Sequence, residues 1–200
     1  MNVTRASHRS CCAPVHAGFT LIELMITLVV LVILASIAVP NLSGFLVRSQ
    51  RQQATSEFIT AIALSRSEAV KRGVPVTMAA VDSGTEAFAG GWRIFTDPQR
   101  TGIFDFPGNE VIAQREAFNT SEIKIGRRGG SPLLADGKLI IHFDSIGRAT
   151  TLNGASGATG FTISVWRAGT ERAKEAVCIG WAGRARTVED KADNESGGCV

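Results

Sequence analysis

The 200-residue sequence has few of the side chains that enzymes use for proton transfer and metal binding. It contains no tyrosine, three histidines and four cysteines. It has no Gly-x-Ser-x-Gly element of the kind that carries a catalytic serine. The glycine-rich stretches 126–130 and 153–160 lack the Lys-Ser/Thr pair of a phosphate-binding loop. We therefore interpret the chain as a non-enzyme that needs no cofactor.

A single histidine, His142, lies beyond residue 18. Side chains alternate along a strand, so Ile141 and Phe143 should share one face and His142 and Asp144 the other. We expect this second face to be solvated. Two such residues could contribute to a metal site, but no third or fourth ligand is spaced nearby, and the sequence predicts no metal.

Acidic residues are absent from the first 18 positions, where Arg5 and Arg9 are the basic ones. This bias predicts that the N-terminal end stays in the cytoplasm. Without these two arginines, the count of Lys+Arg falls from 21 to 19, against 18 Asp+Glu. The rest of the chain is thus nearly neutral, and a nucleic-acid site would have to depend on a local patch.

Residues 19–40 form an apolar run in which Glu23 is the only charge. A helix rises 1.5 Å per residue, so this run could cross about 30 Å of hydrocarbon. A secretory signal is cut after its apolar segment, whereas here the plausible small-residue boundary, Gly18, comes before it. We therefore expect residues 1–18 to be a leader and the transmembrane run to remain in the mature chain.

The helical pattern continues over residues 41–72. One face carries small and apolar residues at helical spacing, namely Phe58, Ala61, Ile62, Ser65 and Ala69. Lys71 and Arg72 suit a helix C-terminus, Gly73 suits the position after it, and Pro75 prevents continuation. The sequence predicts one helix of about 50 residues whose second half is amphipathic.

After Gly73 the apolar period changes from that of a helix to that of strands. The predicted strands are 74–81, 92–96, 110–118, 122–125, 138–143, 148–151, 161–167 and 176–181. Turn-rich segments separate them, including 126–132 and 153–160. Antiparallel strands packed on the helix would make residues 73–200 the β part of an α+β fold.

The stretch Gly18–Pro40 closely resembles the prepilin signature of type IV pilins and type II secretion pseudopilins. In that family a prepilin peptidase cuts after the glycine and the new terminal residue, here Phe19, is N-methylated. Glu23 would then be the fifth residue, and the resemblance implies that it meets the terminal ammonium of a neighbouring subunit during assembly. Alternatively, Glu23 lies shallow enough in the bilayer to reach the headgroups.

Three further stretches, Ser65–Val76, Gly91–Asp97 and Phe143–Ala149, are similar to GspH/FimT-type minor pilins. The resemblance implies a pilin-like fold and other pilins as partners. It also implies an inner-membrane location with a periplasmic C-terminal domain, followed by incorporation into a pilus at the cell surface.

The segment Gly183-Arg184-Ala185-Arg186 resembles the Gly-Arg-x-Arg element of FimT-type minor pilins, which is implicated in DNA capture during natural transformation. Alternation in a strand would place Arg184 and Arg186 side by side, and guanidinium groups suit phosphate oxygens. Other basic residues that could extend this patch are Arg127, Arg128, Arg167, Arg172 and Lys174. We expect non-specific binding of double-stranded DNA.

Other interpretations stay open. Basic residues also protect exposed edge strands from aggregation. Four acids interspersed with the basic residues weaken any net field, namely Glu171, Glu175, Glu189 and Asp190. Trp166 and Trp181 are candidates for stacking on bases, but both lie in apolar strand contexts, and we expect them to fill the core. The chain could be a structural minor pilin that primes pilus assembly, or a type II secretion pseudopilin that acts on protein export.

Two of the four cysteines, Cys11 and Cys12, fall in the expected leader. Cys178 and Cys199 would remain in an oxidising compartment, where a disulfide between them is the simplest expectation. Such a bond would hold the polar C-terminal tail.

Overall fold

The computed structural model describes the backbone of residues 18–83, 87–104, 108–118, 122–128, 134–135, 137–155, 159–167 and 170–188. Within these ranges, the side chains of 37–41, 43, 127–128, 134–135, 159–162, 164–167 and 170–173 lie outside the described set. The chain divides into two compact units, Met1–Ser43 and Gly44–Val200.

One helix, α1 (Leu21–Arg72), runs through both units. In the first unit its large apolar side chains are exposed, from Leu21 at 78% to Leu34 at 62%. No helix within the described residues is long and apolar enough to span a bilayer. The predicted transmembrane run, 19–40, includes side chains outside the described set, and its role in the membrane stays a prediction.

The second unit contains the rest of α1, a short 3₁₀ helix η1 (Phe88–Gly90) and ten described strands. The strands are β1 (Val76–Ala80), β2 (Trp92–Thr96), β3 (Val111–Arg115), β4 (Ile123–Arg128), β5 (Leu134–Ala135), β6 (Lys138–Phe143), β7 (Ala149–Thr150), β8 (Thr159–Arg167), β9 (Thr170–Ile179) and β10 (Ala185–Val188).

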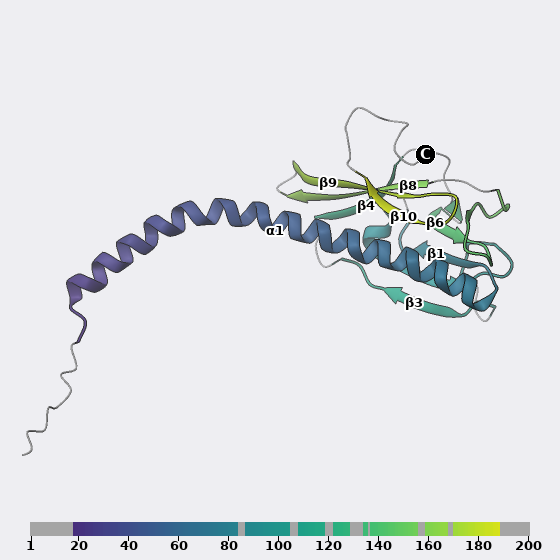
Figure 1. Ribbon diagram of the computed structural model, residues 1–200, viewed down its shortest axis with the longest axis horizontal. Coiled ribbons are helices and arrows are strands. Elements are labelled where there is room, and N and C mark those ends of the chain that lie inside the picture. The colour runs from purple at the N-terminus through teal and green to yellow at the C-terminus, as the bar shows by residue number, and fades with distance from the viewer. Residues whose placement is uncertain are drawn as a thin grey trace, which may run out of the picture. The chain divides into compact units, whose positions relative to one another are not determined.

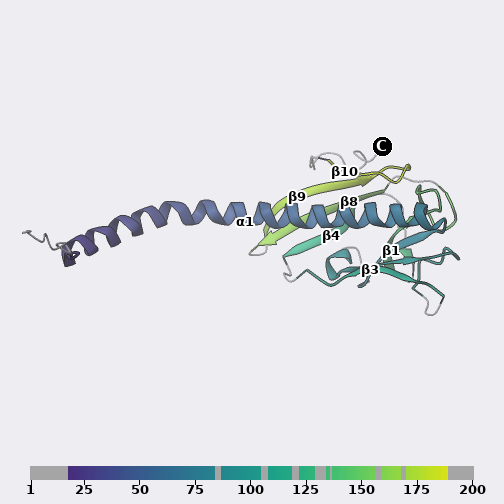
Figure 2. The same cartoon turned by 60° about the horizontal axis from the view of Figure 1, so that its bottom comes forward.

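These strands form two antiparallel sheets. The first has the order β3-β2-β1-β6-β5, with β7 also paired to β6, and the second has the order β10-β9-β8-β4. Figures 1 and 2 show the strands of both sheets alongside the second half of α1. Consecutive strands are neighbours in most pairs, as expected where short turns connect antiparallel strands.

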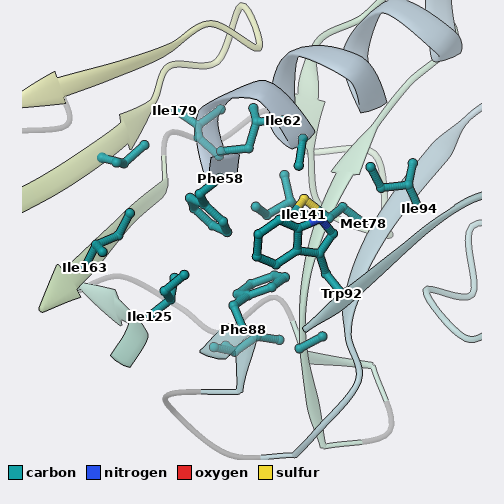
Figure 3. Close-up of a cluster of buried hydrophobic side chains, with 14 of the residues drawn as sticks. Phe58, Ile62, Met78, Phe88, Trp92, Ile94, Ile125, Ile141, Ile163 and Ile179 are labelled. Carbon is teal, nitrogen blue, oxygen red and sulfur yellow. The ribbon is translucent and has the colours of Figure 1, made fainter. Parts of the chain in front are cut away.

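The core of the second unit lies where α1 and the two sheets meet. Figure 3 shows Phe58 and Ile62 of the helix pointing toward side chains from both sheets, among them Met78 and Ile179. Phe58 makes edge-to-face contacts with Phe88 and Trp92, at centroid distances of 5.3 and 5.7 Å. The predicted apolar face of α1 is confirmed, since all five of its residues are buried.

The first sheet is also covered on its opposite face. Ala79, Phe95 and Ile140 form a second buried cluster there, against which Phe104 and Leu152 pack. A central strand such as β6 is therefore buried along almost its whole length. Polar residues on the second face of this sheet, such as His142, are therefore also buried.

Most predicted elements are confirmed, with shifts at their ends. The helix ends at Arg72, and Gly73 follows with a φ of +67°. The strands predicted at 92–96 and 138–143 have those bounds in the structure.

Two predicted loops are wrong. Residues 126–128 belong to β4 because they pair with Gly160–Thr162 of β8, which itself begins at Thr159. Strand β9 begins at Thr170, earlier than predicted, because it forms a long hairpin with β8.

Candidate functional site

The N-terminus of α1 holds the residues expected for processing and assembly. Gly18 and Phe19 lie before the helix, from which Thr20 separates them, and both are exposed. The Glu23 amide donates to Thr20 Oγ1 at 3.3 Å, and the Thr20 amide donates to Glu23 Oε2 at 3.5 Å. This is a reciprocal capping box, which satisfies two backbone donors at a helix start. The Thr-x-x-Glu spacing could have revealed it in the sequence.

Three of the stretches compared above with minor pilins converge on one side chain, Arg66 of α1. Its Nε donates to the Gly147 carbonyl at 3.0 Å. A Cβ built on Gly183 would lie 3.1 Å from Arg66 Cδ and would overlap the carbonyl oxygen of Gly147. Arg66 therefore joins the helix to two turns that are far apart in sequence. Helical spacing places Arg66 off the face that carries Phe58 and Ile62 and gives no sign of these contacts.

The first of these turns is held by Asp144. Its Oδ1 accepts the amides of Ile146 and Arg148 at 3.1 and 2.8 Å, and its Oδ2 accepts Arg148 Nε at 2.8 Å. Burial by itself raises the pKa of Asp144, but the hydrogen bonds from Arg148 and Ile146 outweigh it and bring the pKa below its ordinary value.

The second turn connects β9 to β10 and contains Trp181. The Gly180 amide donates to the Arg184 carbonyl at 3.0 Å, and the Gly183 amide donates to Gly180 at 2.8 Å. The Trp181 carbonyl accepts the Ala149 amide at 3.1 Å. The Trp181 side chain is 64% exposed. The expectation that it fills the core is wrong, because the tight turn carries it off the sheet.

Both arginines of the Gly-Arg-x-Arg segment are exposed. Arg186 lies in β10 opposite Cys178, whereas Arg184 comes just before the strand begins. Between 180 and 188 the sequence has no acidic residue. The acids nearest to this segment along the chain are Glu175 before it and Glu189 after it.

A groove of about 680 Å³ lies between α1 and this hairpin. Its apolar lining includes Ile59, Val70 and Ala185. Three cationic residues also line it, namely Arg66, Lys71 and Arg184. Glu68 is bonded to Lys71 at 3.4 Å and to Arg72 at 2.6 Å, so two cations neutralise the acid next to the groove.

The wider basic patch is only partly described. Lys174 is exposed, and the side chains of Arg127, Arg128, Arg167 and Arg172 lie outside the described set. Backbone pairing connects Arg128 through Gly160 and Cys178 to Arg186, in one row across the second sheet.

Neighbouring positions on a strand belong to opposite faces. Arg127 and Arg128 therefore cannot both lie on the face of the sheet that Arg186 occupies. The side chain of Trp166 also lies outside the described set, so its predicted roles stay predictions.

His142 and Asp144 are buried, so the prediction of a solvated face is wrong. Thr77 Oγ1 donates to Asp97 Oδ2 at 2.8 Å and lies 2.7 Å from His142 Nδ1. Because the hydroxyl proton is used on Asp97, the imidazole Nδ1–H is the donor to Thr77.

Burial lowers the pKa of His142 below its ordinary 6.5, which Arg100 reinforces and the carboxylates of Asp97 and Asp144 oppose. The described residues contain no group of three or more metal-ligating side chains.

Cys178 is buried in β9 and is disulfide-bonded. The predicted partner, Cys199, lies outside the described residues, so the pairing Cys178–Cys199 stays a prediction.

Comparison with known proteins decides the family. The family model for the type II transport protein GspH matches residues 54–183, which is more than half of the chain. The chain belongs to the GspH family. A prokaryotic N-terminal methylation motif matches residues 15–39. This GspH-family chain is thus a minor pilin or pseudopilin, and its family consists of structural pilins rather than enzymes. The motif implies an inner-membrane prepilin that is processed and assembled with other pilins.

The curated relatives match only over a short segment. The chain is 46% identical over 43 residues to type II secretion system core protein G of Pectobacterium carotovorum subsp. carotovorum, covering 22% of this chain and 28% of that protein. The same protein of Aeromonas hydrophila is 46% identical over 44 residues, covering 22% and 31%. The chain thus matches less than a third of the length of either relative.

The solved structures extend the likeness to the domain. The type IV minor pilin FimU of Pseudomonas aeruginosa matches with a TM-score of 0.51 at 17% identity, covering 71% of this chain and 90% of that chain. At this identity the match establishes the fold alone. The predicted pilin-like α+β fold, a long N-terminal helix packed on antiparallel sheet, is confirmed.

Proposed function

We propose that this chain is a structural subunit of a pilus-like filament, with the first half of α1 in the filament core and the β domain facing outward. The observation that carries this proposal is the contrast between exposed and buried apolar side chains on one helix. The described large apolar residues between Leu21 and Leu34 are exposed, and they coincide with the methylation motif. An exposed apolar surface of this extent calls for a partner or lipid to cover it.

Processing between Gly18 and Phe19 would leave Glu23 one turn from a new N-terminal ammonium. In an apolar filament core, a carboxylate and an ammonium from neighbouring subunits attract strongly, and either one left alone is penalised. Before assembly, the capping box with Thr20 gives the Glu23 carboxylate a partner within its own chain. Assembly would then exchange this local contact for one between subunits, which fixes the stagger of adjacent helices.

The test separates the charge of Glu23 from its capping role. Glu23→Gln keeps a capping side chain but removes the charge, and Thr20→Ala weakens the cap but keeps the charge. We expect Glu23→Gln and Glu23→Ala to insert in the membrane and to lose most incorporation into sheared filaments, measured by immunoblotting. Thr20→Ala should retain incorporation. Wild-type incorporation of Glu23→Gln would exclude the ion-pair role.

Two kinds of filament fit this subunit, a type IV pilus and a type II secretion pseudopilus. Deleting the gene for this chain would stop a different process in each case. Loss of pili with normal export would indicate priming of pilus assembly. Exoproteins retained in the periplasm would indicate a secretion pseudopilus.

A second candidate function is the non-specific binding of extracellular DNA in natural transformation. It is supported by the exposed Arg184 and Arg186, which lie in a segment, 180–188, that has no acid in its sequence. Two to four phosphate contacts would give weak binding with a steep salt dependence, and many copies on a fibre would raise the avidity.

This function is tested by titrating the full chain in detergent micelles with duplex DNA at several salt concentrations. The double variant Arg184→Ala/Arg186→Ala should bind more weakly, and the slope of log affinity against log salt should fall by about 2. Equal binding and equal slopes for the two proteins would remove these residues from the function.

A further inference from the structure

We propose that the groove between α1 and the β9–β10 hairpin binds single-stranded DNA, with an unpaired base stacked on Trp181. This inference rests on the DNA-binding role proposed above and names the form of nucleic acid. Proteins that hold single strands combine a cationic groove along the backbone with aromatic side chains for the bases. Trp181 does not itself line the groove, but Gly183 and Arg184, which follow it in the same turn, do.

The aromatic part is Trp181. A tryptophan that is 64% exposed leaves most of a large apolar surface in water. The turn that carries it is fixed by three backbone hydrogen bonds, two within the hairpin and one from Ala149. Gly183 anchors the same turn against Gly147 and Arg66. The indole is thus attached to an ordered backbone, and little backbone entropy is lost when a base stacks on it.

The cationic part is the groove wall. Arg184, three residues after Trp181, lines the groove together with Arg66 and Lys71 across from it on α1. The Lys71 side chain is 75% exposed. Arg66 already donates its Nε to Gly147, and Lys71 lies 3.4 Å from Glu68. We therefore assign Arg184 to phosphates first, and Lys71 would have to exchange Glu68 for a phosphate. The apolar lining, which includes Ile59 and Val70, suits sugars and base faces.

These features favour a single strand over a duplex. In a duplex the base faces are stacked on one another, and an indole reaches one only if the base is unpaired. A duplex offers phosphates to Arg184 and Lys71 but leaves Trp181 without a stacking partner.

The experiment compares three labelled probes on the full chain in detergent micelles, by fluorescence anisotropy. The probes are a short oligothymidylate, an abasic oligomer of the same length, and a blunt duplex. We expect the oligothymidylate to bind about tenfold more tightly than the abasic oligomer, which corresponds to one stacked base. This comparison uses only the wild-type protein, so it does not depend on how a variant folds.

Variants then assign the effect to Trp181. Trp181→Ala should weaken oligothymidylate binding by about tenfold and leave duplex binding unchanged, and Trp181→Phe should restore most of the loss. Ile146→Ala is the matched control, because Ile146 is exposed to the same degree, 63%. It should bind all three probes as the wild type does.

Each outcome bears on one of the two proposals. Equal affinity for oligothymidylate and abasic oligomer would overturn stacking and leave DNA binding by the arginines standing. Failure of the wild type to bind any probe would overturn both. If Trp181→Ala bound DNA normally but entered filaments poorly, Trp181 would belong to a protein interface, and the stacking role would be excluded.

Discussion

The two halves of α1 contain similar apolar residues in different surroundings. In the first half, Ile22 and Leu31 are 63% and 62% exposed, whereas Phe58 and Ile62 in the second half are fully buried. Both halves have the residues of a stable helix, and in the second unit Phe58 and Ile62 pack against sheets of the same chain. The difference teaches that apolar content does not decide burial within a subunit. We expect other molecules to cover the first half, whereas the fold itself buries the apolar face of the second.

The largest effect should come from removing the helix's main contribution to the domain core. Phe58→Ala deletes a ring that contacts Phe88 and Trp92 and should destabilise the domain by about 3–5 kcal/mol. Urea unfolding, followed by fluorescence, measures it. Leu64→Ala on the same helix is the control, since Leu64 is 36% exposed and its truncation should cost only about 1 kcal/mol. Similar midpoints for both variants would contradict the assigned core.

A smaller effect is expected at the turn that seats the hairpin. In Gly183→Ala the new Cβ would overlap the Gly147 carbonyl, at a φ of +74°. Gly73→Ala has a similar φ of +67° with open space around it, so its cost should be only that of the backbone conformation, about 1–2 kcal/mol. Gly183→Ala should destabilise the domain by at least about 1 kcal/mol more than this control does. Equal destabilisation in urea would mean that the hairpin is not held against Gly147.

The free energy of unfolding of the second unit should also depend on pH, because His142 is buried in that unit. Its pKa is lowered in the folded chain, so the unfolded chain takes up a proton first as the pH falls through about 6.5. The unfolded state then binds more protons, and the free energy of unfolding falls as the pH drops, by up to about 1.4 kcal/mol per pH unit. Urea midpoints between pH 7 and 5 measure it.

His142→Gln provides the comparison for this slope, because glutamine cannot take up the proton. The groups that act on the imidazole are Asp97, Arg100 and Asp144. The pKa of Asp144 is lowered from 3.8, so this carboxylate remains ionised in the same range. A wild-type slope identical to that of the variant would contradict a neutral, buried His142.

The smallest effect should be that of Glu23→Ala on the domain. Glu23 lies in the first unit and bonds only with Thr20 in the contacts described for it. The free energy of unfolding of the second unit should stay within about 0.5 kcal/mol of the wild type. A larger change in the urea midpoint would show that the two halves of α1 are energetically coupled.

Several features could be predicted because they depend on residues close in sequence. The end of α1 follows from Lys71, Arg72, Gly73 and Pro75, and the buried stripe around Phe58 follows from helical spacing. The methylation motif over 15–39 is likewise a local pattern. The prediction that one strand contains both Arg184 and Arg186 is wrong, because β10 begins at Ala185. Arg184 precedes the strand and lines the groove.

The amino-acid sequence by itself determines the long helix, the change to strands after Gly73 and the N-terminal motif. Each of these depends on hydrogen bonding and residue spacing within a few turns or residues. Tertiary structure alone decided which polar residues are buried and which aromatic residue is exposed. His142 is buried because a second apolar cluster covers the far face of its sheet, and Trp181 is exposed because a turn anchored on Arg66 carries it away. Both outcomes depend on contacts between segments far apart in sequence, whose pairing no local pattern specifies.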